Sequence, residues 1–141
     1  MKTTVDIRNF TRKNPAAGVP FEKLTAAVLP GWEISLVFAG ETRAQALNVA
    51  LRKKTYTPNV LSYETGTKSG EIIICPAVAR RQAADYGLSH KNFIAYLFIH
   101  GLLHLKGHPH GATMEKHERA LLARFGLGTI TTHGTTNRNR H

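Results

Sequence analysis

The order of hydrophobic and polar positions along the chain predicts four strands and five helices. Val5 and Ile7 alternate with polar neighbours, as in a strand, and "EIIIC" contains three consecutive isoleucines, as in a strand buried on both faces. The predicted strands cover residues 3–10, 32–40, 60–64 and 71–77, with a turn at 65–70 before the last strand. The predicted helices cover residues 21–29, 41–54, 77–87, 90–106 and 112–128.

One of these helices, residues 90–106, is apolar on nearly every side. Such a helix is expected at the centre of a domain, packed between other elements. Ser89 is a candidate N-cap for it, and Gly107 can end it. We therefore expect a single α/β (α+β) domain over residues 1–127, in which a small, mostly four-stranded sheet packs with helices around this central helix. The polar, basic tail at 128–141 is expected to be flexible.

The composition agrees with a globular domain and disfavours several classes of protein. Hydrophobic residues make up 42% of the 141 residues, which is enough for one core. Cys75 is the only cysteine, so no internal disulfide is expected and a reducing compartment is indicated. The first residues lack the apolar run of a secretory signal, and the longest apolar run, 93–105, is shorter than the about 20 residues of a membrane-spanning helix. We expect a cytoplasmic protein with no membrane partner.

The charge balance indicates a polyanionic partner. Nineteen Lys and Arg stand against nine Asp and Glu, for a formal net charge of +10. Such an excess favours binding to nucleic acid, an acidic membrane or the ribosome. The basic residues recur along the whole chain, in "TRK", "LRKK", "ARR" and "NRNR", so charge alone does not indicate a particular site.

Four histidines lie close together in the sequence "HGLLHLKGHPH". His100 and His104 are four residues apart in a predicted helix, which is the spacing by which a helix offers two imidazoles to one zinc ion. Gly107 can end the helix, so that His108 or His110 supplies a third imidazole and one coordination position stays open for water. The alternative is a set of core histidines bonded to the backbone or to hydroxyls, but a cluster this dense favours a metal site.

A pair of histidines at this spacing also occurs in zinc peptidases of the H-E-x-x-H type, where the glutamate is the general base. Gly101 occupies the glutamate position here, so peptide hydrolysis of that type is disfavoured. Glu64, Glu71 and Asp85 are carboxylates that could approach the histidines only through folding. The sequence therefore predicts a metal site without an evident general base.

The segment "HGLLHLKGHPH" resembles the signature H-G-x-L-H-L-x-G-[YH]-D-H of the YbeY family, the bacterial endoribonucleases of rRNA maturation. "LNVALRKKTYTPNVLSYE" resembles L-N-x-x-[YF]-R-x-K-D-x-P-T-D-V-L-S-F-P of the same family, and "GEIIIC" resembles G-D-I-x-I-[CS]. "MEKHERALLARFGL" is similar to the helix that closes the family's fold. These four segments occur in the family's order and cover roughly residues 41–127, which makes chance a poor explanation.

The resemblance implies roles for individual residues. The family's three metal histidines correspond to His100, His104 and His110, and the arginine of its active-site groove corresponds to Arg52. His100 and Arg52 are thus the candidate catalytic residues. His108 falls where the family has Tyr or His, and is expected to support the metal ligands without binding the metal itself.

Two departures from the family pattern affect the surroundings of the expected metal site. Asn59 stands where the family has Asp and can still form a hydrogen bond, so we expect it to support a ligand. Pro109 stands where the family has the Asp of its histidine signature, and it has no polar side-chain atom. Loss of a carboxylate that orients a ligand can weaken metal binding or activity.

The resemblance implies a zinc-dependent endoribonuclease with one Zn²⁺ per chain that acts on single-stranded RNA. Its expected role is maturation of the 3′ end of 16S rRNA and ribosome quality control. The expected partners are rRNA, the small ribosomal subunit and its assembly proteins, with no DNA. The alternative is a non-catalytic, rRNA-binding ribosome-assembly factor in which zinc is structural or vestigial. The basic charge fits both, the open coordination position favours the enzyme, and the missing aspartates favour the binding protein.

Overall fold

The computed structural model describes residues 2–131, and Met1 and residues 132–141 lie outside this range. The strands are β1 (Thr4–Asn9), β2 (Glu33–Phe38), β3 (Val60–Gly66) and β4 (Ser69–Ile74). The helices within the described range are α1 (Phe21–Val28), α2 (Glu41–Arg52), α3 (Pro76–Gln82), α4 (His90–Lys106) and α5 (Ala112–Arg124), and a 3₁₀ helix, η1 (Ala83–Tyr86), follows α3. Within residues 2–131, no helix is long and apolar enough to cross a bilayer.

The strands form one mixed sheet in the order β1-β2-β4-β3. β1, β2 and β4 are parallel, and β3 pairs antiparallel with β4 through a hairpin. Parallel neighbours need a crossover connection, which α1 provides between β1 and β2. The register pairs Leu36 with Ile72 and Leu61 with Ile73, so each face of the sheet carries its own apolar set.

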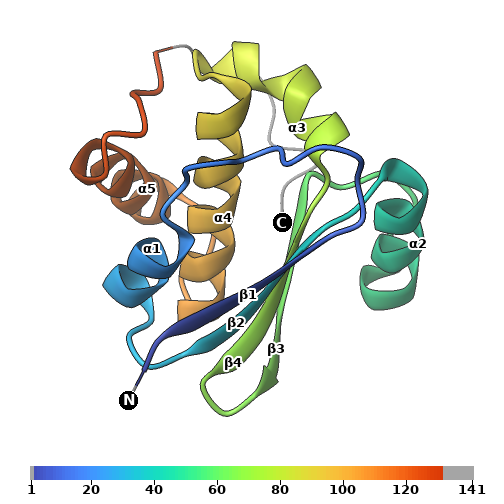
Figure 1. Cartoon of the computed structure of the whole chain (residues 1–141), viewed down its shortest axis with the longest axis horizontal. Helices are drawn as coiled ribbons and strands as arrows, with labels where there is room; N and C mark the ends of the chain where they lie inside the picture. Colours follow the sequence, from blue (N-terminus) through green and yellow to red (C-terminus); the bar gives the residue numbers. More distant parts are fainter. Residues whose placement is uncertain (1, 132–141) are drawn as a thin grey trace.

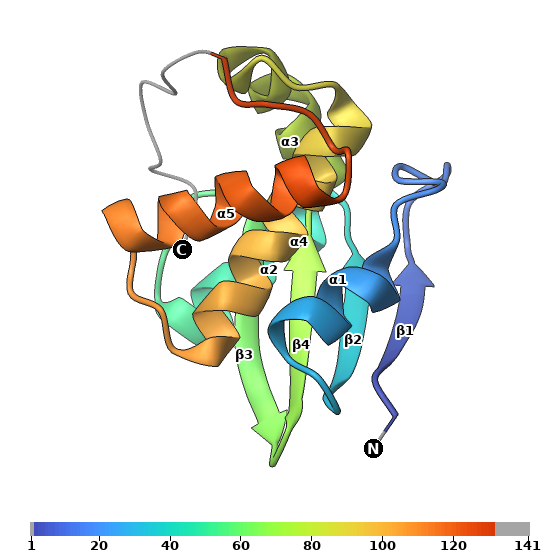
Figure 2. The same cartoon turned by 90° about the vertical axis from the view of Figure 1, so that its left-hand side faces the viewer.

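The helices cover the two faces of the sheet unequally. α1, α4 and α5 lie on one face and α2 lies on the other (Figure 1), and the quarter-turned view shows α5 crossing α4 in front of the strands (Figure 2). Ile72 and Ile74 pack into the large core beneath α4, whereas Ile73 joins a smaller cluster beneath α2. The run of three isoleucines is therefore buried on both faces, as the sequence predicts.

α4 is the central helix, with the bounds that the sequence predicts. The Ser89 hydroxyl accepts a hydrogen bond from the Asn92 N–H at 3.1 Å, which caps the first turn. At the other end Gly107 adopts φ +107°, a left-handed conformation that glycine reaches without strain, and its N–H donates to the His104 carbonyl. The predicted α+β class, with a four-stranded sheet and helices packed around this helix, is confirmed.

Several element boundaries differ from the sequence prediction; α2 and α5, for example, end at Arg52 and Arg124 instead of at residues 54 and 128. The β3–β4 hairpin turns at 67–68 alone, so residues 65–66 and 69–70, predicted as turn, extend the strands. Thr65 and Gly66 are exposed, and the two glycines and two hydroxyl residues of this segment are typical of turns, which conceals the pairing of the backbones. The predicted helix at 77–87 ends early as the 3₁₀ helix η1, which Gly87 closes at φ +70°. The domain limit at 127 and the flexible tail remain predictions, since residues 132–141 lie outside the described range.

Gly101 allows α4 to lie close to β4. A Cβ atom at this position would stand 3.1–3.3 Å from three side-chain atoms of Ile72, which is fully buried. We expect Gly101→Ala to destabilise the fold by about 1–2 kcal/mol, because overpacking outweighs the helical preference for alanine. Urea unfolding measures this loss.

Ile72→Val provides the control for this contact. Combined with Gly101→Ala, it should cost less than the two single changes together, with a coupling of at least about 0.5 kcal/mol. Strictly additive losses would show that the two residues do not compete for the same space.

Candidate active site

Three histidines gather at the C-terminal end of α4. His100 and His104 lie one turn apart on the helix, and the turn after Gly107 brings His110 back beside them. The His100 and His110 rings have centroids 4.8 Å apart at 84°, and the His104 and His110 rings have centroids 6.4 Å apart at 86°. His100 is buried, His104 half-buried and His110 exposed, so the cluster opens from the core to the surface.

The histidine cluster consists of His100, His104 and His110. It has the donor atoms of a zinc site, but one of its ring separations differs from those around a bound zinc ion. Three imidazoles on one tetrahedral zinc have ring centroids about 5 Å apart, given Zn–N bonds of about 2.0–2.1 Å. The His100–His110 separation meets this value, and the His104 ring would have to move by about 1 Å toward His110. As placed, no three His, Cys, Asp or Glu side chains in the described range stand ready to hold a metal ion. A small side-chain rotation of His104 is the adjustment that the cluster needs.

A buried carboxylate orients His100. The Glu118 side chain, 1% exposed, lies 2.6 Å from His100 Nδ1 through Oε2, while its Oε1 accepts a hydrogen bond of 3.2 Å from the Tyr96 hydroxyl. A carboxylate accepts the Nδ1 proton, which makes Nε2 the electron-pair donor of the ring. This carboxylate–imidazole arrangement is the one that orients histidine ligands in metal sites.

Glu118 is not among the site residues predicted from the sequence, although its position in α5 carries a signal. Met114, Glu118 and Leu122 follow one another at intervals of four, and all three are buried. A glutamate between two core positions on one face of an amphipathic helix is unusual, because such a side chain is rarely buried without a partner. The identity of that partner, a histidine on α4, follows only from how the two helices pack.

Arg52 lies at the C-terminal end of α2 on the side of the histidine cluster. Its Nη1 donates a hydrogen bond of 2.9 Å to the Tyr56 hydroxyl. The pKa of His104 is lowered from its ordinary value, first by burial and then by the charges of His100, His110 and Arg52. The Arg52 guanidinium is thus close enough to act on the cluster, and it adds the smallest contribution to a shift that burial mainly causes and that favours the neutral form of His104, the form that a metal ligand needs.

The two other predicted site residues have partners of their own. The Asn59 amide donates to Gln82 Oε1 at 2.8 Å, and Asn59 Oδ1 has no hydrogen-bond partner within the described range. His108 packs against His117 of α5, with ring centroids 5.0 Å apart. The structure brings the three histidines and Arg52 together, and it gives Asn59 and His108 contacts with other residues.

Glu71, one of the carboxylates considered from the sequence, is engaged elsewhere on the sheet. It accepts hydrogen bonds from the Ser35 and Tyr63 hydroxyls on the face that α2 covers. Burial, followed by the Glu71 carboxylate, raises the pKa of Tyr63 to about 12. The carboxylate that reaches the histidine cluster is Glu118 rather than Glu71.

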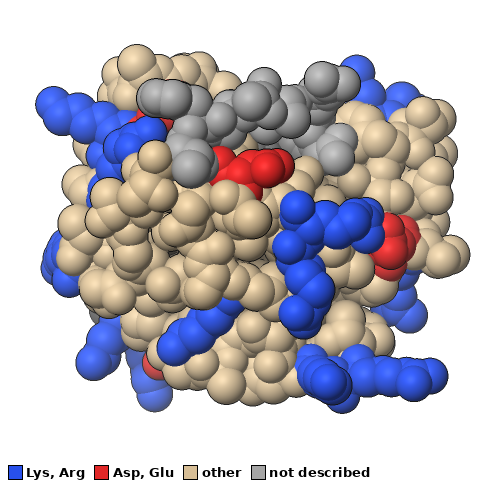
Figure 3. Space-filling model, turned by 90° about the horizontal axis from the view of Figure 1, so that it is seen from above, with Lys and Arg blue, Asp and Glu red and all other residues tan. Residues whose placement is uncertain are grey.

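The positive charge is spread over the surface. In the view from above, Lys and Arg side chains stand at many separate points around the molecule, with few Asp and Glu between them (Figure 3). This distribution agrees with the recurrence of basic residues along the sequence. It provides a general attraction for a polyanion, so selectivity for a position on that polyanion must come from more local features.

The structure is a small α+β domain with three histidines and an arginine near one end of its central helix, and comparisons with known proteins identify its family and fold. A profile described as endoribonuclease YbeY matches residues 4–126. The chain belongs to the endoribonuclease YbeY family. Its solved structural relatives include the solution structure of TM1509 from Thermotoga maritima, which superposes with a TM-score of 0.57 at 18% identity, over 95% of this chain and 99% of that one, and shows the shared fold.

Several relatives carry the name Endoribonuclease YbeY. The protein from Xylella fastidiosa is 35% identical over 135 residues, 82% of this chain and 83% of that protein. The protein from Thiobacillus denitrificans is 37% identical over 114 residues, which cover 74% of this chain and 78% of that protein. The protein from Bdellovibrio bacteriovorus is 36% identical over 97 residues, 67% of this chain and 62% of that protein, so the match spans less than two thirds of that relative.

Removal of the Glu118 carboxylate should destabilise the fold. Glu118→Ala removes the carboxylate to which the buried Tyr96 hydroxyl and the His100 ring are hydrogen-bonded, and the loss of a buried hydrogen bond to a charged group costs about 1–3 kcal/mol. Chemical unfolding of the metal-free protein measures the loss. Glu115→Ala is the control, because Glu115 is an exposed acidic residue on the same helix and its removal should change stability by no more than about 0.5 kcal/mol. Equal losses would show that the buried hydrogen bonds contribute nothing.

Proposed function

We propose that this protein is a zinc-dependent endoribonuclease that cleaves single-stranded RNA during rRNA maturation. The observation that carries the proposal is the histidine cluster beside Arg52, in a chain of a family whose relatives are named endoribonucleases. We further propose that its substrate is the 3′ end of 16S rRNA and that it serves ribosome quality control. Its partners would be the small ribosomal subunit and its assembly proteins, in the cytoplasm.

We propose that His100, His104 and His110 hold one zinc ion per chain. A zinc ion supplies a Lewis acid for a phosphoryl oxygen and lowers the pKa of water to about 7. The lowered pKa of His104 keeps its imidazole neutral, and Glu118 fixes the tautomer of His100 that offers Nε2. These two features of the protein support the assignment.

Arg52 is the residue that we propose for the phosphate. A guanidinium can form two parallel hydrogen bonds with phosphate oxygens and stabilise the negative charge that develops at phosphorus. The hydrogen bond to Tyr56 restricts the Arg52 side chain, so less conformational entropy is lost when it binds the phosphate. The distributed basic surface would hold the rest of the RNA, and binding should weaken steeply as salt rises.

A second function, that of an rRNA-binding assembly factor without catalysis, is favoured by one observation. Pro109, exposed in the turn between His108 and His110, offers no side-chain hydrogen bond to a metal ligand. Pro109→Asp would restore a carboxylate next to His110 and should raise metal affinity or cleavage by about tenfold if the turn limits the enzyme. Tight, salt-sensitive RNA binding with no cleavage by either protein, whatever the metal, would favour the assembly factor.

The first prediction of this proposal concerns metal content. Protein purified without an affinity tag should contain close to one zinc per chain by elemental analysis, and His110→Ala should lose most of it. His108→Ala is the matched control from the same turn and should retain its metal, because His108 contacts His117. Metal loss from His108→Ala together with retention in His110→Ala would contradict the proposed ligands.

Glu118→Gln tests how His100 is oriented. The amide keeps the size of the side chain but can donate a hydrogen bond to Nδ1, which moves the imidazole proton to Nε2. Zinc affinity should fall by about 10–100-fold, as measured by competition with a chelator. An unchanged affinity would show that Glu118 supports only the fold.

The last prediction of the proposal concerns Arg52. Arg52→Ala should lower the rate of RNA cleavage by about a hundredfold or more, with metal content and thermal stability almost unchanged. Lys54→Ala removes a neighbouring, exposed positive charge and should lower the rate only slightly. If the two variants lose the same activity, Arg52 contributes general attraction for RNA instead of acting on the reacting phosphate.

A further inference from the structure

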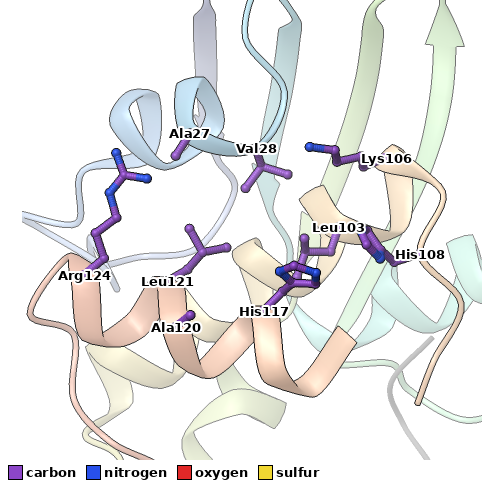
Figure 4. A pocket seen from close by; sticks show the side chains of 9 residues that line it. All are labelled: Ala27, Val28, Leu103, Lys106, His108, His117, Ala120, Leu121 and Arg124. Atoms are coloured by element: carbon purple, nitrogen blue, oxygen red, sulfur yellow. The ribbon is translucent and has the colours of Figure 1, made fainter. Parts of the chain in front are cut away.

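A pocket lies where α1, α4 and α5 meet, and none of the residues that line it belongs to the histidine cluster. Figure 4 shows its lining, with Val28 of α1, Leu103 of α4 and Leu121 of α5 around the cavity. Val28 and Leu103 are buried in the core and Leu121 is half-buried, so the floor of the pocket is apolar and rigid. Its volume is about 220 Å³. This is below the about 300–1,000 Å³ of clefts that enclose drug-sized ligands, so it has room for only part of a larger molecule.

The rim of this pocket is basic and aromatic. Lys106 and Arg124 stand at its edge, and the rings of His108 and His117 form one wall (Figure 4). Among the described residues that line it, none is Asp or Glu. The Arg124 guanidinium lies 5.3 Å from the centroid of the Phe125 ring, which helps to hold it in place. An anionic group with a flat, apolar ring attached fits both the rim and the floor.

The chain connects this pocket directly to the histidine cluster. His108 lines the pocket and His110 belongs to the cluster, with only Pro109 between them. Consecutive Cα atoms are about 3.8 Å apart, so the two backbone positions lie within about 7.6 Å of each other. A polymer held at the cluster can therefore reach the pocket by crossing this short turn.

We propose that the pocket binds a nucleotide of single-stranded RNA that flanks the phosphate at the histidine cluster. The base lies on the apolar floor and stacks on the exposed imidazole of His117, to which the His108 ring is tilted by 57°, as bases do on aromatic side chains of RNA-binding proteins. Lys106 and Arg124 contact the adjoining phosphates. This subsite rests on the proposed action on RNA, and it supplies the local contacts that the distributed surface charge lacks.

The main test compares two double variants that remove the same charge. Lys106→Ala/Arg124→Ala changes the pocket, and Lys116→Ala/Arg119→Ala changes exposed residues of α5 that do not line it. Fluorescence anisotropy with a labelled single-stranded RNA of about 12 nucleotides measures the dissociation constant across a range of salt concentrations. The pocket variant should bind at least tenfold more weakly, and its slope of log Kd against log salt should fall by about 1.4, the value for two lost phosphate contacts. The control variant should stay close to the wild type.

His117→Ala tests stacking without removing a permanent charge. At pH 8 it should weaken RNA binding by about fivefold or more while leaving the salt slope unchanged. Equal weakening by the two double variants, or a His117→Ala variant that binds like the wild type, would overturn the pocket assignment. Thermal unfolding of each variant confirms that these surface changes leave the fold intact.

Cleavage kinetics separate this proposal from the proposed function. In a cleaving enzyme, the pocket variants should raise KM and leave kcat nearly unchanged, whereas Arg52→Ala should lower kcat. A change in kcat without a change in KM would overturn the subsite. A wild-type protein that cleaves no RNA would overturn the nuclease. If the wild-type protein cleaved no RNA but bound it, and the pocket variants bound RNA more weakly, the pocket would be the RNA contact of a non-catalytic binding protein.

Discussion

The close contact between α4 and the sheet is the constraint on which the rest of the structure depends. Because Gly101 has no side chain, the backbone of α4 lies close to Ile72 of β4. The apolar residues around α4 then pack against β4, α1 and α5 simultaneously. The helix that carries His100 and His104 is thereby held on every side. The backbone positions that carry the two imidazoles are fixed in this way, so a side-chain rotation is enough to bring His104 closer to His110.

The burial of polar groups beneath the cluster follows from the same packing. A helix enclosed by apolar neighbours cannot expose the inner nitrogen of His100 to water, so a partner has to come from within the protein. Glu118 of α5 fills that need, and Tyr96 of α4 satisfies its second oxygen. The contact between α4 and α5 thus has an apolar part and a polar part, and the polar part determines which nitrogen of the His100 ring is left available to a ligand.

Local signals in the sequence were sufficient for α4 but not for the surroundings of the site. Ser89 and Gly107 mark the ends of α4 through interactions within a few residues, so its bounds could be predicted. The strand ends in the β3–β4 hairpin consist of Gly, Ser and Thr, residues that are typical of turns, so the sequence predicts a longer turn than the structure has. Glu118 and the contact of His108 with His117 depend on how α5 lies across α4, which no spacing along the chain indicates.

The exposed turn after α4 gives the histidine cluster two parts of unequal local stability. His100 and His104 belong to a buried helix, whose amide hydrogens exchange with solvent only when most of the fold opens. His110 stands in an exposed segment between Gly107 and Gly111, both with positive φ, and such segments open at little free-energy cost. An ion held by all three rings would therefore enter and leave when the segment between Gly107 and Gly111 moves and carries His110 away. The rate of metal exchange would be set by this short segment, while the affinity would be set by the whole fold.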